Sequence, residues 1–301
     1  MIKSIMVENP KKETLVLELT HPEKSGIYVK SVEGLGPGKS TVNVNEIATS
    51  DGGVFASSRM NARNIILTLG MMFDPLIEDA RHKIYKYFPI KKSIILTIET
   101  DYRTSFIEGY VESNEPDIFS EEETAQISLI CPNPWFYDIG GSKDAFSGIE
   151  NLFEFPFSNE SVTEDLIEFG NIRQGTLVGI NYKGDIDTGV LMRIRFGEVT
   201  DKMIIYNVDT SEKMTLWLSR IADITGEELS KKDEIEISTF TGSKYIYLWR
   251  NGRYYNIFPV LDHFTSWFKL SAGVNQFAFS ANGHESDIII EFKYKNMYGG
   301  I

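Results

Sequence analysis

The sequence predicts a mainly β protein made of two domains. Short apolar segments with alternating polar residues recur along the whole chain, and Gly, Pro or Asn residues separate them. A clear helical spacing of apolar residues occurs in the first half, where it covers about four turns. A chain of 301 residues favours two hydrophobic cores, because single cores stop growing at roughly 250–300 residues.

The first half reads as a β domain. Its apolar segments alternate with polar residues or run continuously, as strands of a sheet do. An acidic stretch at residues 112–124, which contains Pro116, predicts an exposed loop, with contact to a partner protein as the alternative. The expected strands are residues 14–20, 26–32, 41–45, 63–69, 92–99, 104–111 and 125–131.

One helix is expected in this domain, at about residues 74–88. Asp74 followed by Pro75 is a helix start, because the carboxylate accepts hydrogen bonds from free amides and proline already has a helical φ. Pro89 ends the helix. Apolar residues at steps of three and four form one stripe, which predicts that the helix lies on a sheet; they are Ile77, Ala80, Ile84 and Phe88.

The second half predicts a β-sandwich or jelly roll, because short strands recur at regular spacing with turn signals between them. The clearest hairpin has Asn251 and Gly252 at its turn, and one helical turn is expected within residues 221–229. The expected strands are residues 152–157, 166–169, 176–182, 190–196, 203–207, 214–218, 234–239, 244–250, 253–257, 274–280 and 287–294.

A seam at residues 128–138 divides the chain. Two prolines in it, Pro132 and Pro134, lack an amide donor, so we expect the strand to end and the chain to change its pairing partner. Large aromatic residues follow and need a surface to bury against. We therefore place the domains at residues 1–138 and 139–301 and expect three residues to pack at the joint between them: Trp135, Phe136 and Tyr137.

Composition excludes several classes of protein. The net charge is −13 and both halves are acidic, which argues against a DNA-binding module held by phosphate contacts. Cys131 is the single cysteine, so an internal disulfide and cysteine-rich metal sites are excluded. No apolar run is long enough for a bilayer, and residues 1–8 do not resemble a signal peptide. We expect synthesis in a cytoplasm and no membrane partner.

Three motifs resemble chemical sites and are better explained as turns. Residues 34–40 resemble a phosphate loop, but they have three residues where that loop needs four, and a strand follows instead of a helix. Asp187 begins an Asp-Thr-Gly triplet that has no second copy to complete an aspartic-protease pair. Asp185 and Asp187 could bind a cation, although such spacing is common in solvated turns.

The chain offers no other catalytic, cofactor or metal site. Its four histidines lie far apart in the sequence, and no cysteine joins them to complete a metal site: His21, His82, His263 and His284. The thiol beside Pro132 is expected to be buried and inert. We therefore expect a protein without catalysis, cofactor or metal.

Aromatic residues in the second half are the remaining candidate site. Tyr245, Tyr247 and Trp249 alternate with other residues and so share one face of their strand. They suit contact with a sugar or with a partner protein, and the same residue types also build sandwich cores and oligomer interfaces. Other aromatics are expected nearby: Trp217, Tyr254, Tyr255 and Trp267.

Several segments resemble the distal tail proteins of siphophages. In the first half these are residues 34–37, 51–55 leading into Arg59, 63–67, the helix around Arg81, and the closing residues 130–138. At the other end, residues 289–294 and 298–301 resemble the terminus of phage tail components.

The resemblance implies a structural virion protein at the tail tip. Six copies would form a ring through the N-terminal domain, and a galectin-like sandwich would project from it. The ring would act as a baseplate hub that joins the tail tube to the tail-hub and receptor-binding proteins. DNA would pass through the lumen without specific binding, in keeping with the acidic composition.

Two other functions remain open. The chain could be a carbohydrate-binding module whose Tyr245, Tyr247 and Trp249 contact host cell-wall polysaccharide. It could also be an enzyme with a site assembled between subunits, but the sequence offers no activated nucleophile or metal set for one.

Overall fold

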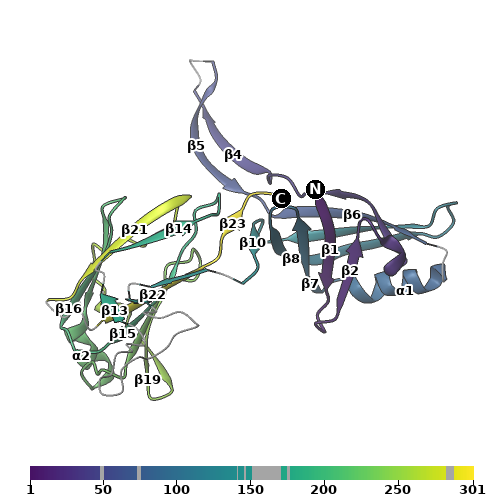
Figure 1. Ribbon diagram of the computed structural model, residues 1–301. Coiled ribbons are helices and arrows are strands. Elements are labelled where there is room, and N and C mark those ends of the chain that lie inside the picture. The colour runs from purple at the N-terminus through teal and green to yellow at the C-terminus, as the bar shows by residue number, and fades with distance from the viewer. Residues whose placement is uncertain are drawn as a thin grey trace, which may run out of the picture. The chain divides into compact units, whose positions relative to one another are not determined.

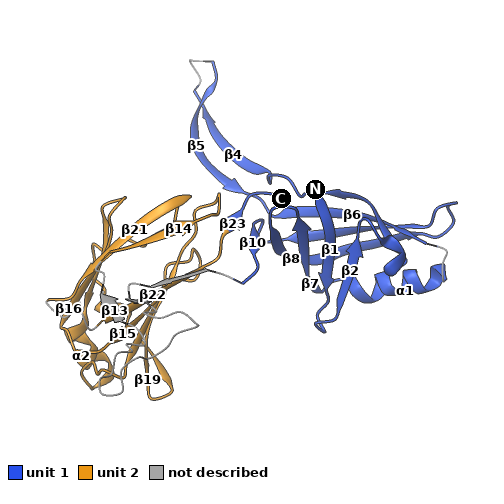
Figure 2. Cartoon of the chain, in the orientation of Figure 1, with its two compact units in different colours: residues 1–140, 297–301 blue, residues 141–296 orange. Residues whose placement is uncertain are grey.

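The computed structural model describes residues 1–47, 51–72, 76–140, 142–145, 147–150, 171–174, 177–282 and 288–301. Strands dominate these residues, and every pair of them is antiparallel. The chain forms two units: unit 1 contains residues 1–140 and 297–301, and unit 2 contains residues 141–296 (Figure 2). Residues 297–301 therefore lie with the first unit, whereas the sequence assigned them to the second domain.

Unit 1 is built on a nine-stranded sheet (Figure 1). Seven strands follow the order β2-β1-β7-β8-β9-β6-β3, and β10 and β23 extend the sheet beside β8. The strands are β1 (Ile2–Glu8), β2 (Thr14–Glu18), β3 (Ile27–Glu33), β6 (Arg63–Met71), β7 (Ser93–Thr100), β8 (Thr104–Asp117), β9 (Thr124–Cys131), β10 (Phe136–Asp138) and β23 (Met297–Tyr298), with a short 3-10 helix η1 (Pro22–Lys24).

Helix α1 (Ile77–Tyr87) packs on this sheet through the apolar stripe that its sequence predicts. Ala80, Ile84 and the following Phe88 are buried in the core of unit 1. The expected helix start, Asp74 and Pro75, lies outside the described residues.

Strand β8 is longer than the sequence predicted. The prediction of an exposed loop at residues 112–124 was wrong for its first part, because residues 112–117 continue β8 and pair with β9. The pairing of β8 with β9 shifts register after Val111 and then continues, and Pro116 lies near the end of the strand. The segment is polar because its side chains line the partly exposed end of the sheet, which hides the usual strand pattern.

The seam around Pro132 and Pro134 interrupts a strand, as expected, but only one pairing partner changes. Strand β9 lies between β8 and β6. After the prolines, β10 resumes along the same β8, with Tyr137 opposite Phe106. Its other neighbour is now β23, which pairs Tyr298 with Phe136. Unit 2 is therefore inserted between two adjacent strands of unit 1.

The Arg63 side chain lies at the point where the second neighbour changes from β6, which pairs with β9, to β23, which pairs with β10. Its side chain is 4% exposed. The guanidinium donates to backbone carbonyls in separate segments: Nε to Pro134 O at 2.7 Å, Nη1 to Gly34 O at 2.6 Å and to Gly36 O, and Nη2 to Gly299 O at 2.6 Å. The cation also lies 4.7 Å from the centroid of the Phe136 ring.

A second arginine fastens the same C-terminal segment. Arg103 donates from Nη2 to Gly300 O at 2.5 Å and stacks 4.0 Å above the ring of Tyr298. The amide of Ile301 donates to Leu35 O at 3.0 Å. A Cβ on Gly300 would meet the Gly36 carbonyl carbon at 3.1 Å, so a larger residue there would have to displace the neighbouring backbone by a few tenths of an ångström.

Unit 2 contains two sheets that face each other across one apolar core. It is the β-sandwich that the sequence predicted. One sheet has β11 (Ser142–Ala145), β22 (Ile288–Tyr294), β15 (Leu191–Phe196), β18 (Glu234–Ser238), β19 (Tyr245–Arg250) and β20 (Arg253–Asn256), in that order. The other has β14 (Leu177–Tyr182), β21 (Gly273–Ser280), β16 (Lys202–Asn207) and β17 (Glu212–Trp217).

Smaller elements complete unit 2. Strands β12 (Ser147–Glu150) and β13 (Asn171–Gln174) form a separate pair. The helical turn expected near residue 221 is α2 (Ile221–Thr225), flanked by η2 (Leu218–Arg220), and η3 (Phe258–Val260) follows β20. The strands expected at 152–157 and 166–169 lie outside the described residues.

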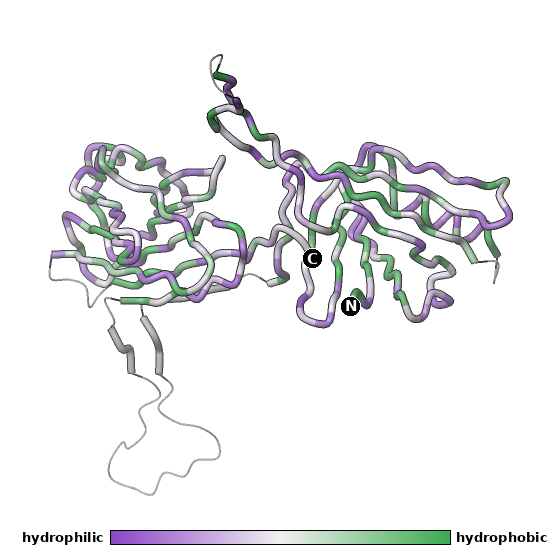
Figure 3. Tube along the Cα trace, turned by 90° about the horizontal axis from the view of Figure 1, so that it is seen from above, coloured by the Kyte–Doolittle hydropathy of each residue, from purple (hydrophilic) through white to green (hydrophobic). Residues whose placement is uncertain are grey.

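The predicted hairpin at Asn251 and Gly252 is confirmed. These residues join β19 to β20 and have φ values of 48° and 79°, as a tight hairpin turn requires. Figure 3 shows hydrophobic and hydrophilic residues alternating along many strands of both units.

Replacing Arg63 should strongly destabilise unit 1. Arg63→Ala leaves the buried carbonyls without their charged donor, and we expect the free energy of unfolding to fall by about 3 kcal/mol. Chemical denaturation followed by tryptophan fluorescence measures the change. Arg59→Ala, at an exposed arginine of the same unit, should change it by less than about 0.5 kcal/mol. Equal stability of the two variants would contradict the role of Arg63.

Candidate functional site

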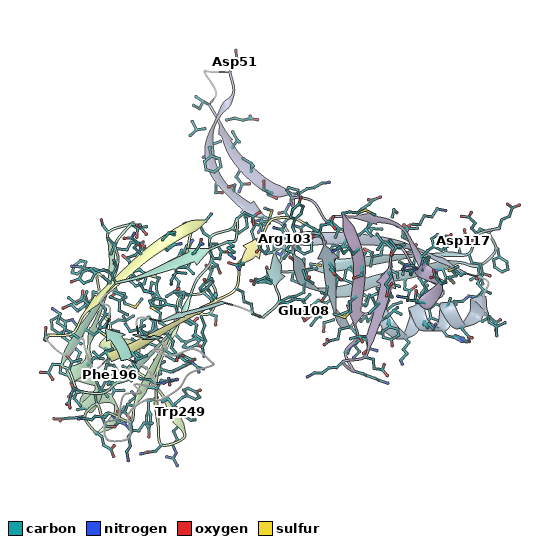
Figure 4. All side chains as sticks on the ribbon, in the orientation of Figure 1. Asp51, Arg103, Glu108, Asp117, Phe196 and Trp249 are labelled. Carbon is teal, nitrogen blue, oxygen red and sulfur yellow. The ribbon has the colours of Figure 1, made fainter. Side chains whose placement is uncertain are left out.

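An aromatic row lies on the outer face of the second unit's six-stranded sheet. Tyr245, Tyr247 and Trp249 point outward from β19, because Ile246 and Leu248 between them point into the core. The hairpin brings Tyr254 of β20 directly opposite Trp249. Figure 4 labels Trp249, in the region where Figure 1 labels β19. The structure thus brings together the three aromatic residues that the sequence singled out.

The rings of this row contact one another. Those of Tyr245 and Tyr247 are stacked with centroids 4.7 Å apart, whereas Trp249 and Tyr254 meet at 4.4 Å with a 48° tilt. Tyr247 also lies 6.0 Å from Tyr254. Trp249 is 37% exposed and Tyr254 is 60% exposed. The row therefore ends in two aromatic side chains with accessible surface.

Charged residues of neighbouring strands contact the row at its Tyr245 end. The Tyr245 hydroxyl donates to Glu236 Oε1 at 2.8 Å, and Arg193 Nε donates to Glu236 Oε2 at 2.9 Å. Burial, followed by the hydrogen bond to the Glu236 carboxylate, raises the pKa of Tyr245 to about 12. The phenol therefore stays protonated and keeps donating to Glu236 at neutral pH.

The aromatic row borders an open hollow of about 570 Å³. Its lining combines three aromatic rings with a carboxylate and an amide: Tyr245, Tyr247, Tyr254, Glu236 and Asn256. Asn256 Oδ1 accepts a hydrogen bond from the Phe258 amide at 3.0 Å, which fixes the orientation of this side chain. The hollow offers apolar ring surface together with donors and acceptors. We name it the tyrosine hollow.

The other aromatics expected near this row take separate roles. Tyr255 points to the opposite side of β20 and packs against the core. Trp217 donates from Nε1 to Asp262 Oδ2 at 3.0 Å, and Trp267 stacks on Phe258. The sequence did not identify Glu236 or Asn256. Strand pairing could have found them, because both lie opposite Tyr247 on neighbouring strands.

A second candidate surface is the hairpin of β4 (Ser40–Glu46) and β5 (Gly53–Met60), which we call the arm. The arm pairs only with itself in the described structure and stands away from the nine-stranded sheet (Figure 1). Figure 4 places Asp51 at its tip. Side chains on both faces of the arm are exposed, and one face carries Val42 at 54%, Val44 at 53% and Phe55 at 62%.

The glycine-rich loop at residues 34–40 contacts Arg63 through backbone carbonyl groups and not through its amides. Gly34 and Gly36 accept hydrogen bonds from Arg63. Gly34 has a φ of 84°, and a Cβ there would lie 2.1 Å from Asn64 O. A loop that binds a cation through its carbonyls is unsuited to a phosphate group, in agreement with its interpretation as a turn.

The remaining sequence candidates are the pair Asp185 and Asp187 and the single cysteine, Cys131. No group of three or more metal-ligating side chains occurs in the described residues, so Asp185 and Asp187 are not joined by further ligands. Cys131 is fully buried, and burial raises the pKa of its thiol to about 11. Among the described helices, none is long and apolar enough to cross a membrane.

The three aromatics of the seam differ in their surroundings. Phe136 is fully buried in the core of unit 1, beneath Arg63. Tyr137 lies 5.8 Å from the Phe106 ring and accepts a hydrogen bond from Asn133 Nδ2 at 2.6 Å. Trp135 is partly buried. Packing of these residues against the second unit remains a prediction.

The fold resembles that of known phage tail structures. The crystal structure of the Dit protein of phage SPP1 matches with a TM-score of 0.61 and 13% sequence identity, over 97% of this chain and 99% of that chain. It is described as a paradigm of the hub adsorption apparatus in phages that infect Gram-positive bacteria. A chain of the phage P2 baseplate in its activated conformation with Ca matches at 14% identity with a TM-score of 0.46, over 98% of each chain.

Sequence comparison finds no such relationship. No protein-family model matches the chain, and no curated protein sequence does.

Tyr245 should titrate near pH 12 in the folded protein. Because this pKa exceeds its usual value of 10.0, the protonated phenol stabilises the fold below pH 10, and the stabilisation is lost as the pH rises toward 12. Carbon NMR of labelled tyrosine measures the titration, and Tyr245→Phe assigns the signal. Glu236→Gln should lower the pKa by removing the charged acceptor. An unchanged value would show that Glu236 does not contribute.

Proposed function

We propose that this protein is a structural hub of a siphophage tail tip, with no catalytic activity. Likeness to SPP1 Dit carries this proposal, because the match includes both units and nearly the whole of each chain. The proposed role follows that of the matched protein.

The finer proposal is a ring of six copies formed through unit 1. It would join the tail tube to the tail-hub and receptor-binding proteins, and DNA would pass through its lumen without specific binding. The number six comes from the family resemblance. The sequence contributes an acidic character, with a net charge of −13, which suits a surface past which DNA slides.

The arm is the surface of unit 1 that we assign to the ring contact. A hairpin of two strands is marginally stable in water unless another surface packs against it. The exposed Val42, Val44 and Phe55 provide an apolar face for such packing. We propose that this face packs on a second copy of unit 1. The resulting contact joins unlike surfaces, and such contacts close into a ring when the rotation between copies permits.

Replacing the arm's apolar face should prevent ring assembly. We expect the wild-type protein to form particles of six times its 34.2 kDa mass, and Val44→Ser/Phe55→Ser to remain monomeric. Mass photometry and light scattering measure the oligomer. Circular dichroism should show the fold unchanged, since these side chains belong to neither core cluster.

Phe264→Ser is the matched control, because Phe264 is 85% exposed and lies outside the arm. It should assemble like the wild type. A wild-type protein that stays monomeric at high concentration, both alone and with a tail-tube partner, would contradict the hub. Rings formed equally well by the arm variant would contradict the arm contact alone.

A further inference from the structure

We propose that the tyrosine hollow binds a neutral polysaccharide chain. This activity goes beyond the hub role and requires only a folded unit 2. The proposal depends on accessible aromatic surface, fixed polar groups and local charge.

The aromatic surface suits the apolar face of a sugar ring. A pyranose presents a face of C–H groups and an edge of hydroxyls, so its binding site needs an aromatic face beside polar groups. Tyr254, which lines the hollow, is 60% exposed, and Trp249, which lies beside Tyr254 just outside the lining, is 37% exposed. Their mutual contact at 4.4 Å limits their motion and lowers the entropy lost when a ligand binds.

The polar groups suit the hydroxyl edge. Glu236 already accepts hydrogen bonds from Tyr245 and Arg193, but a carboxylate has about four acceptor sites, so each oxygen can accept another. Asn256 is exposed. Its Oδ1 accepts a hydrogen bond from the Phe258 amide, which leaves the two N–H groups of Nδ2 to donate to a ligand. A sugar hydroxyl both donates and accepts, and the hollow supplies both partners.

Shape favours an internal segment of a chain over a chain end. The volume of about 570 Å³ falls within the roughly 300–1,000 Å³ of ligand sites, but the hollow is open and not enclosed. Strand β20 is the edge of its sheet, so no further strand of this sheet closes that side in the described structure. A polymer can therefore continue beyond the hollow.

Charge at the hollow offers no attraction to anionic polymers, which favours neutral glycans among polymers with suitable rings. Glu236 lines the hollow, and Glu234 lies directly opposite Trp249 on the next strand. Two arginines of β15 are paired with these carboxylates: Arg193 with Glu236 at 2.9 Å and Arg195 with Glu234 at 2.8 Å. Phosphate-rich and uronate-rich polymers, and single-stranded nucleic acid, would find no clustered unpaired cations on this face.

Direct binding tests the proposal. Calorimetry with purified full-length protein uses soluble dextran, galactan, mixed-linkage glucan and oligomers of N-acetylglucosamine as neutral probes. Polygalacturonate and a teichoic acid serve as anionic probes. We expect binding to at least one neutral probe and to neither anionic one. Absence of binding to every neutral probe, or preference for an anionic one, would overturn the proposal.

Variants then locate the site. Trp249→Ala and Tyr254→Ala should each weaken binding of the neutral probe at least tenfold, and Glu236→Gln should weaken it less. Phe264→Ala removes an exposed aromatic residue outside the hollow and should bind like the wild type. Undiminished binding by Tyr254→Ala, which alters the lining of the hollow, would overturn the assignment, whatever the result for the adjacent Trp249→Ala. Because these measurements do not depend on ring assembly, they can fail or succeed independently of the hub.

Discussion

A single buried guanidinium organises the junction from which unit 2 departs and to which it returns. Arg63 begins β6, and its carbonyl partners come from the loop after β3, the proline link before β10 and the segment after β23. A charge buried to this degree is stable only when hydrogen bonds replace its water. These segments must therefore be in place together, which joins the beginning and the end of the chain into one folded unit.

The two candidate surfaces depend on ordinary features of β structure. On β19, side-chain alternation sends Ile246 and Leu248 inward and leaves the aromatic row outside. In the arm the same alternation has no core beneath it, so its apolar side chains remain exposed. The sandwich provides an already folded surface for a ligand, whereas the arm requires a partner surface. A hub that also bound glycan would divide these tasks between its units.

The sequence was informative where the pattern is local. The stripe of α1, the Asn251-Gly252 hairpin and the outward face of β19 follow from spacing and turn chemistry within a few residues. It failed where long-range pairing decides. Nothing near residues 297–301 predicts that they return to β10, and polar residues 112–117 form a strand because β9 pairs with them. Glu236 became part of a candidate site only through its cross-strand neighbours.

The paired strands β10 and β23 place the two connections to unit 2 side by side, with Tyr137 opposite Met297. Adjacent strands lie about 4.8 Å apart, so any domain whose own termini are neighbours can occupy this position without disturbing the sheet. The junction therefore sets only one geometric condition on the inserted domain, the spacing of its two ends. A domain that meets this condition leaves the sheet, its arginine and the closing segment unchanged.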